Sequence, residues 1–250
     1  MIRRLRESGP GLVKKYIAAN TAGSITNIAR DAAKEMFPEY QQNRTLHNRH
    51  SDAAASALAD AARRYLLSRQ APPERNRILI LTGAPASGKT ASSGPEQGQT
   101  IEIVHETILS SLDRASELVD QALAAARVPI VRLFYTDDPR INVQRMIDRA
   151  RAIGRTVPIE YMAKMYVRVP LIVQALKARF NAQLTLLVTN NSETPQHAVP
   201  HNDIVRALYH VNRYNERECL EIMDAQLSEI RAGSNPIPDA IFHEARLGLS

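Results

Sequence analysis

The fold class is decided by the stretch Arg77-Ile78-Leu79-Ile80-Leu81-Thr82-Gly83-Ala84-Pro85-Ala86-Ser87-Gly88-Lys89-Thr90. Most of its first six residues are apolar, which is typical of a strand buried on both faces of a parallel sheet. Its last eight match G-x-x-x-x-G-K-[ST], in which the glycines let backbone N–H groups turn inward around phosphate oxygens. The stretch therefore predicts a buried strand that ends in a phosphate-binding loop.

Outward from this stretch, apolar runs alternate with helical patterns. The further strand candidates are 101–105, 128–135 and 183–189. The helix candidates between or after them are 112–126, 141–153 and 160–180. We expect Pro170 to interrupt the last of these helices. Strands that alternate with helices predict an α/β fold, here a P-loop NTPase-like parallel sheet flanked by helices.

The regions on either side of this core read as helical. Ser24 is a candidate N-cap for a helix that runs to Phe37, and a second helical pattern begins at Ser51. Two further helices are expected near 202–213 and 216–231. The predicted organisation is an N-terminal helical region, a P-loop kinase-like core and a C-terminal helical extension packed on that core, at 1–73, 74–195 and 196–250.

Composition places the chain among soluble globular proteins, with 250 residues, 44% hydrophobic and 23% charged. No apolar run is long enough to span a bilayer, and no apolar stretch or cleavage site follows the basic residues at the N-terminus. Cys219 is the only cysteine, so an intrachain disulfide is excluded and we expect a buried structural thiol. These features favour a cytoplasmic protein without a membrane partner.

The net charge of +6 comes from 32 basic residues, of which only six are lysines. Arginine suits phosphate binding because its planar guanidinium donates two parallel hydrogen bonds. Genomic base composition would produce the same bias. Nucleic acid ranks second as a partner, because aromatic residues make up only 5%, tryptophan is absent and the arginines are spread along the chain.

The loop predicts ATP and Mg²⁺ as cofactors. Lys89 is expected to contact the β- and γ-phosphates, and the Thr90 hydroxyl to hold the metal. The nucleotide-binding candidates are Gly83, Ala84, Pro85, Ala86, Ser87, Gly88, Lys89 and Thr90. The residues that follow contain Gly94, Pro95 and Gly98, so a helix after this loop can last about two turns at most.

Phosphate transfer also needs a carboxylate near the acceptor hydroxyl and a shell for the metal. Glu106 follows a predicted strand and is a candidate for acceptor binding, although a first-turn helix carboxylate would look the same. Asp137 also ends a strand and is a candidate metal ligand through water. The alternative for Asp137 is a structural role beside Asp138-Pro139, which is an ordinary helix start.

Three arginines follow on the next predicted helix and just beyond it. Arg145 and Arg149 share a face at i and i+4, and Arg155 lies one residue past Gly154. They predict a lid that brings arginines to the γ-phosphate, with a solvated basic face as the alternative. The catalytic candidates from the sequence are Lys89, Glu106, Arg145 and Arg155.

The order of these motifs resembles the zeta-toxin family of P-loop kinases, over roughly residues 76–192. The matching segments are 82–90, 104–107, 144–146, 154–158 and 188–192. The resemblance implies an ATP-dependent small-molecule kinase, in a family of which some members phosphorylate UDP-N-acetylglucosamine. It also implies a hydroxyl acceptor such as a metabolite or nucleotide sugar, and an antitoxin or regulatory protein as partner.

The chain departs from that family in one segment. Family members place a catalytic aspartate after the P-loop helix, but the interval from Thr90 to Glu106 contains no aspartate. Either Glu106 or Glu96 takes over its role, or the protein binds nucleotide without transferring phosphate. An enzyme and a nucleotide-binding regulatory protein are therefore both open, and the kinase is the leading hypothesis.

Overall fold

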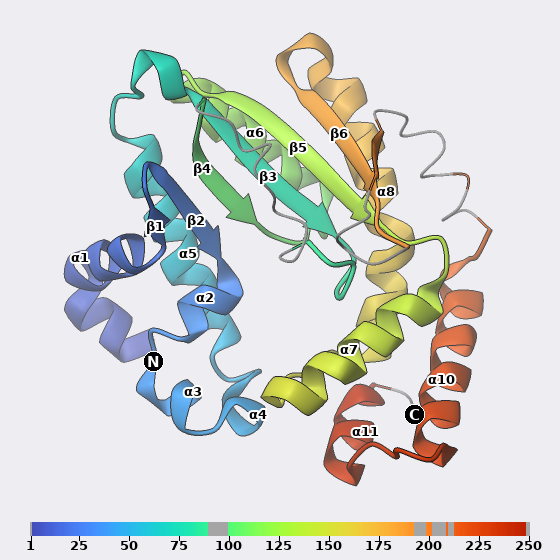
Figure 1. The fold of residues 1–250 in the computed structure, drawn as a ribbon. Coiled ribbons are helices and arrows are strands. Elements are labelled where there is room, and N and C mark those ends of the chain that lie inside the picture. Colours follow the sequence, from blue (N-terminus) through green and yellow to red (C-terminus); the bar gives the residue numbers. More distant parts are fainter. Residues whose placement is uncertain (1, 90–99, 193–198, 202–208, 210–212, 249–250) are drawn as a thin grey trace.

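The computed structural model describes residues 2–89, 100–192, 199–201, 209 and 213–248. Its centre is a seven-stranded sheet with the order β1-β2-β4-β3-β5-β6-β7 (Figure 1). The strands are β1 (Thr21–Ala22), β2 (Ile25–Ala29), β3 (Arg77–Gly83), β4 (Ile101–Glu106), β5 (Val128–Tyr135), β6 (Thr185–Asn190) and β7 (Val199–His201). The five strands from β2 to β6 are parallel, and β1 and β7 pair antiparallel at the two edges. The predicted α/β fold with a parallel sheet is confirmed.

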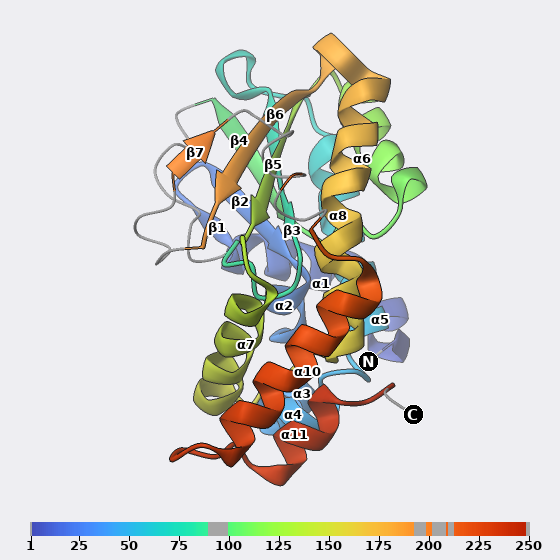
Figure 2. The ribbon, with the colours of Figure 1, turned by 90° about the vertical axis from the view of Figure 1, so that its right-hand side faces the viewer.

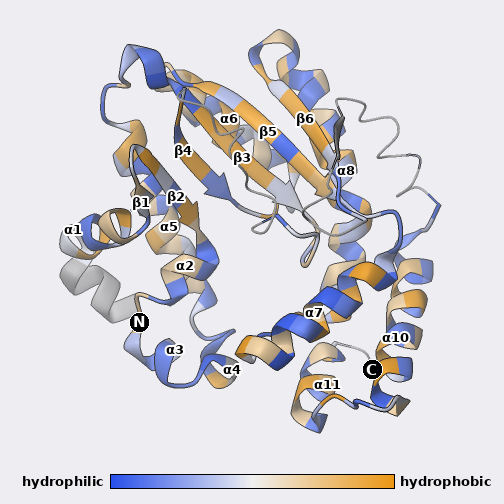
Figure 3. Ribbon diagram, in the orientation of Figure 1, coloured by the Kyte–Doolittle hydropathy of each residue, from blue (hydrophilic) through white to orange (hydrophobic). Residues whose placement is uncertain are grey.

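The central strands form where apolar residues run continuously. All of β3 after its first residue is buried, and so is all of β5 after its first residue. Figure 3 shows both strands as largely hydrophobic. In parallel strands buried on both faces, side chains of either orientation avoid water, so the apolar run is unbroken. All four predicted strands are therefore present, with small changes at their ends.

Helices cover one face of the sheet and continue beyond its carboxyl edge. They are α1 (Ile2–Ala19), α2 (Arg30–Lys34), α3 (Pro38–Gln42), α4 (Arg44–His47), α5 (Asp52–Leu67), α6 (Leu112–Ala124), α7 (Pro139–Ile153), α8 (Ile159–Phe180), α10 (Glu216–Ala232) and α11 (Asp239–Ala245). The largest core lies between the sheet and α5, α6 and α8, with α1 packed on α5 (Figures 1 and 2). A second core joins α7, α10 and α11 to the first half of α8.

Helix α8 is not interrupted at Pro170, so that prediction is wrong. Proline removes one backbone N–H, here the one that would bond to the carbonyl of Tyr166. The helix continues because both cores hold it: Met162 and Tyr166 belong to the second core, whereas Val169 and Val173 belong to the first. Packing on both sides of the proline outweighs the lost hydrogen bond.

The N-terminal region is not wholly helical, and the predicted helix from Ser24 to Phe37 is wrong in its first half. Residues 25–29 form β2, which pairs in parallel with β4, and α2 begins only at Arg30. Ile28 is fully buried in the largest core. The β-branched residues of this segment favour a strand once a sheet edge is available. A segment that precedes the P-loop therefore belongs to the sheet itself.

The C-terminal helices α10 and α11 share a core with α7 and the first half of α8. Helix α10 begins at a capping box between Asn215 and Glu218 and contacts both α7 and α8. Cys219 on this helix is fully buried, and burial raises the pKa of its thiol to about 12. The predicted helix near 202–213 falls mostly outside the described residues. None of the helices in the described part of the chain combines the length and apolarity that crossing a membrane requires.

Candidate functional site

The phosphate-binding motif lies at the carboxyl end of β3, near the middle of the sheet. β3 has β4 on one side and β5 on the other, and the chain passes from β3 to β4 before it crosses to β5. In open parallel sheets, ligands bind outside the carboxyl ends of strands where the connections diverge in this way. Gly83 ends the strand, residues 84–88 form the turn and Lys89 follows. Thr90, predicted to hold nucleotide and metal, lies outside the described residues.

Both motif glycines are required by the local geometry. Gly83 has φ +152° and Gly88 has φ +85°, conformations that side chains disfavour. A Cβ on Gly83 would overlap the carbonyl oxygen of Phe134, and one on Gly88 would overlap the amide nitrogen of Asn191. Between them Ala86 also has a positive φ, +58°. Such alternation turns successive backbone N–H groups to one side of the chain, as in anion-binding nests.

Lys89 lies against the loop rather than in solvent. Its Nζ donates to the carbonyl oxygens of Gly83 at 3.1 Å and Ala84 at 2.9 Å, and the residue is 8% exposed. Burial lowers the pKa of Lys89 to about 8, partly opposed by the nearby carboxylates of Glu106 and Asp31. A buried ammonium that donates to carbonyl oxygens is a suitable partner for an anion.

Helix α7 brings the predicted arginines to the loop. It begins at Asp138, whose carboxylate caps Arg140 N at 2.9 Å, and leads away from the carboxyl end of β5 (Figure 1). The Nη1 atom of Arg145 lies 3.5 Å from where a Cβ on Gly88 would stand, so this guanidinium is in contact distance of the loop. Burial lowers the pKa of Arg145. The predicted proximity of Arg145 to the phosphate loop is therefore observed.

Arg149, one turn further along α7, also faces the site. Its charge helps to lower the pKa of Lys89, and burial lowers the pKa of Arg149 itself. The buried Nε atom of Arg149 finds no hydrogen-bond partner in the part of the chain that the structure describes. A desolvated guanidinium with an unused donor beside a phosphate loop can bind an anionic oxygen.

Asp31 is a site residue that the sequence reading missed. It follows β2, whose last residue, Ala29, pairs with Glu106 at the end of β4. Arg155, which was predicted as a catalytic residue, forms an ion pair with Asp31. Burial would raise the pKa of Asp31, but the cations around it, Arg155 first, outweigh burial and lower it. Asp31 is thus an ionised carboxylate near Lys89, from a segment that precedes the P-loop.

Glu106 occupies the predicted position at the end of β4. It pairs in register with Leu81 on β3, and it is the strongest of the charges that support the protonated form of Lys89. The neighbouring His105 points to the other side of the sheet and is buried, and burial lowers its pKa to about 3. His105 is therefore neutral at physiological pH.

Asp137 is held at the end of β5 by β6. Its backbone N–H donates to Ser192 Oγ at 2.7 Å, and its carboxylate accepts from Asn190 Nδ2 at 2.9 Å. Asp137 follows β5, the strand next to β3. Its carboxylate therefore lies at the same carboxyl end of the sheet as the loop. Among the described residues, no three His, Cys, Asp or Glu side chains gather as a metal site. A metal beside Asp137 would need further oxygen ligands, such as the Thr90 hydroxyl and the phosphates of a bound nucleotide.

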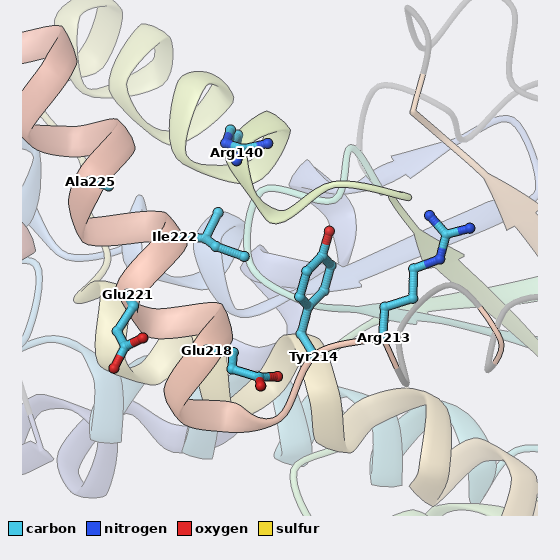
Figure 4. A pocket seen from close by; sticks show the side chains of 7 residues that line it. All are labelled: Arg140, Arg213, Tyr214, Glu218, Glu221, Ile222 and Ala225. Carbon is cyan, nitrogen blue, oxygen red and sulfur yellow. The ribbon is translucent and has the colours of Figure 1, made fainter.

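A separate surface pocket of about 550 Å³ lies where α10 passes the first turn of α7 (Figure 4). Its lining combines basic, acidic and apolar side chains: Arg140, Arg213, Tyr214, Glu218, Glu221, Ile222 and Ala225. It contains none of the predicted site residues. The phosphate loop and this pocket are therefore distinct features of the molecule.

Comparison with known proteins adds no identification. No protein-family model matches the sequence, and no curated protein is significantly similar to it.

Proposed function

We propose that this protein is an ATP-dependent kinase that transfers the γ-phosphate to a hydroxyl group of a small molecule, such as a metabolite or a nucleotide sugar. One observation carries the proposal: a glycine-rich loop ends the central parallel strand, and the carboxylate of Asp31 lies near enough to the lysine of this loop for its charge to raise the pKa of Lys89. A phosphate cradle with a nearby carboxylate is the arrangement that phosphoryl transfer to a hydroxyl requires.

The charges around the loop suit a polyphosphate with a divalent cation. Lys89, Arg145 and Arg149 are desolvated, since burial lowers the pKa of each. Desolvated cations stabilise the negative charge of transferring phosphate oxygens more strongly than cations in water do. In our proposal Mg²⁺ bound to the nucleotide phosphates and to Thr90 supplies further charge neutralisation.

Asp31 takes the role that the resemblance to zeta toxins assigns to an aspartate after the P-loop. The hydroxyl oxygen of the acceptor forms a bond to the γ-phosphorus, and the bond from that phosphorus to the β–γ bridging oxygen breaks. The proton of the hydroxyl passes to Asp31, and ADP leaves. Glu106, in the next strand, stabilises protonated Lys89. In this assignment Asp31 takes the place of Glu106 as the carboxylate that binds the acceptor. The reason is that the catalytic residue of the family is an aspartate, as residue 31 is.

The test is a search for phosphorylated products after incubation of the protein with ATP, Mg²⁺ and a panel of metabolites and nucleotide sugars. Lys89→Ala and Asp31→Asn should each lower product formation by about a hundredfold or more. Asp113→Asn is a matched control, because Asp113 is an exposed carboxylate in the first turn of α6. It should leave the rate unchanged.

Two results would overturn the proposal. A wild-type protein that binds ATP but phosphorylates no acceptor in the panel would be a nucleotide-binding regulatory protein, the alternative function. Phosphorylation that survives Lys89→Ala would place the chemistry elsewhere. If Asp31→Asn retains full activity and Glu106→Gln abolishes it, Glu106 is the acceptor carboxylate and the assignment of Asp31 is wrong.

A further inference from the structure

Two buried asparagines hold the outer side of the phosphate loop. Asn142 Nδ2 donates to the carbonyl oxygen of Pro85 at 2.8 Å, and Asn191 Nδ2 donates to that of Ser87 at 2.7 Å. Asn142 belongs to α7 and Asn191 follows β6, so the loop is tied to two different elements. Both asparagines are fully buried. Asn142 belongs to none of the motifs recognised in the sequence, and Asn191 lies in the segment 188–192, for which the resemblance gives no role.

These hydrogen bonds fix the direction of two peptide groups. In a trans peptide the C=O of one residue and the N–H of the next point in opposite directions. When Asn142 holds the carbonyl of Pro85 on the outside, the N–H of Ala86 must point to the opposite side. The same relationship between Asn191 and Ser87 fixes the N–H of Gly88. Both N–H groups therefore face away from the asparagines.

The backbone of the loop needs such support. Ala86 has a left-handed conformation at φ +58°, which costs a non-glycine residue free energy unless the surroundings hold it. Gly88 also has a positive φ, and its Cα packs so closely on the Asn191 amide that a Cβ has no room. Ala86 and Gly88, the two residues with positive φ in this part of the loop, are those whose N–H groups the asparagines direct. The alternation of backbone conformations in the loop has the form of an anion-binding nest.

The asparagines are themselves held in place. The side-chain oxygen of Asn142 accepts from the hydroxyl of Thr136, and Tyr166 donates to the carbonyl of Thr136 at 2.6 Å. The backbone N–H of Asn191 donates to the carbonyl of Tyr135 at 2.8 Å. A buried amide with its hydrogen bonds made has one favoured orientation, because any other leaves polar groups unpaired. These hydrogen bonds therefore tie the loop, through the two asparagines, to β5, β6 and α8.

We propose that Asn142 and Asn191 are positioning residues, which preorganise the N–H groups of Ala86 and Gly88 to donate to phosphate oxygens. The inference rests on the phosphate-binding part of the proposed function and not on phosphate transfer. Without the amides, the peptide groups at Pro85 and Ser87 can turn, and the N–H donors no longer converge. Each lost charge-assisted hydrogen bond weakens anion binding by about tenfold or more.

The experiment measures binding of inorganic tripolyphosphate to the full chain by calorimetry. Asn142→Leu and Asn191→Leu keep the size of the side chain and remove the donor, and each should lower the affinity by about tenfold or more. Asn142→Asp and Asn191→Asp serve if a leucine variant does not fold. Asn215→Ala is the control for stability alone, since it removes the N-cap of α10, away from the loop. It should lower Tm without changing the affinity.

Backbone NMR separates a loss of positioning from a general loss of stability, because lower stability alone does not remove the ligand-induced shifts of individual amide protons. In the wild-type protein, tripolyphosphate should shift the amide proton resonances of Ala86 and Gly88 downfield, and this shift should be lost in the variants. Unchanged affinity together with unchanged shifts in both leucine variants would overturn the inference. A wild-type protein that does not bind tripolyphosphate would overturn it together with the phosphate site. Binding that depends on the asparagines supports it even if no acceptor is ever phosphorylated.

Discussion

Arg155 and Asp31 form an ion pair that joins the segment after α7 to the helix after β2. Arg155 reaches this position because α7 ends at Gly154, which has a left-handed φ of +68° and turns the chain away from the helix axis. The pair links a residue expected to act on phosphate to one that the sequence reading did not identify. The charge of Arg155 lowers the pKa of Asp31.

We predict that Arg155→Gln raises the pKa of Asp31. Arg155 is the largest of the charge effects that keep this pKa below 3.8, so the neutral glutamine removes part of that depression. In a pH–rate profile, the acid limb should move to higher pH. Arg168→Gln is the control, since Arg168 pairs with Glu216 on the surface between α8 and α10. An acid limb that stays in place in Arg155→Gln would exclude Asp31 as the group that titrates there.

The same variant should change stability in a pH-dependent way. A carboxylate whose pKa is lowered by folding stabilises the protein above its unfolded pKa, and this contribution is lost as pH falls through the folded pKa. Arg155→Gln should therefore lower Tm at pH 7 and have much less effect at a pH below the lowered pKa of Asp31, where Asp31 is protonated in either protein. Equal losses of Tm at both pH values would mean that packing, and not the charge pair, is responsible.

The sequence could predict the buried strand β3 and the glycine-rich turn after it because their signals are local. The apolar run at 77–82 and the glycine-lysine pattern after it need no information from the rest of the chain. β2 was missed because it is short and half-exposed, and only its pairing with the distant β4 makes it a strand. Asp31 was missed with it. The β-branched residues Ile25, Thr26 and Ile28, with an acid three residues after Ile28, were the available signal.

The roles of neighbouring residues on α7 also depended on tertiary structure. Periodicity placed Arg145 and Arg149 on one face, and both do face the site. Arg155 lies past the helix end, where the direction of the chain depends on the cap and on what meets it. The sequence assigned no role to Asn142 or to Asn191, because a buried amide that bonds to a distant carbonyl is specified by three-dimensional packing alone.

We predict that Gly83→Ala destabilises the protein by at least about 2 kcal/mol, because the methyl group meets the rigid backbone of β5 and φ is unfavourable. Gly11→Ala is the matched control: Gly11 lies inside α1 and a Cβ there meets nothing within 4 Å. Alanine at that position should stabilise by about 0.5–1 kcal/mol through helix propensity. Chemical denaturation measures both. Similar small effects at the two sites would contradict the observed loop conformation.

A buried ion pair away from the site gives a fourth prediction. Arg127 is fully buried at its side chain, and its Nη1 lies 2.7 Å from Glu102 Oε2 on β4. Glu102→Ala should cost about 3–5 kcal/mol of unfolding free energy, because it leaves a buried guanidinium without its counter-charge. Glu221→Ala is the comparison, since Glu221 pairs with Arg217 on the exposed face of α10. That variant should cost at most about 0.5 kcal/mol.

The last prediction concerns the pH dependence of anion binding through Lys89. Burial lowers the pKa of Lys89 from 10.5 to about 8, so its ammonium loses its proton within an accessible range. A lysine that binds fewer protons when folded makes the unfolding free energy rise with pH between about 8 and 10.5. Anion binding should move in the opposite direction, because the ligand needs the charged form.

Affinity for tripolyphosphate should therefore fall above pH 8, by up to about tenfold for each pH unit, until the pKa of Lys89 in the complex is passed. Lys89→Arg keeps its charge throughout this range and should show a much weaker pH dependence. Lys89→Met should bind weakly at every pH. Calorimetry between pH 7 and 10 distinguishes the three proteins. A wild-type affinity that stays constant over that range would show that the Lys89 ammonium does not contact the anion.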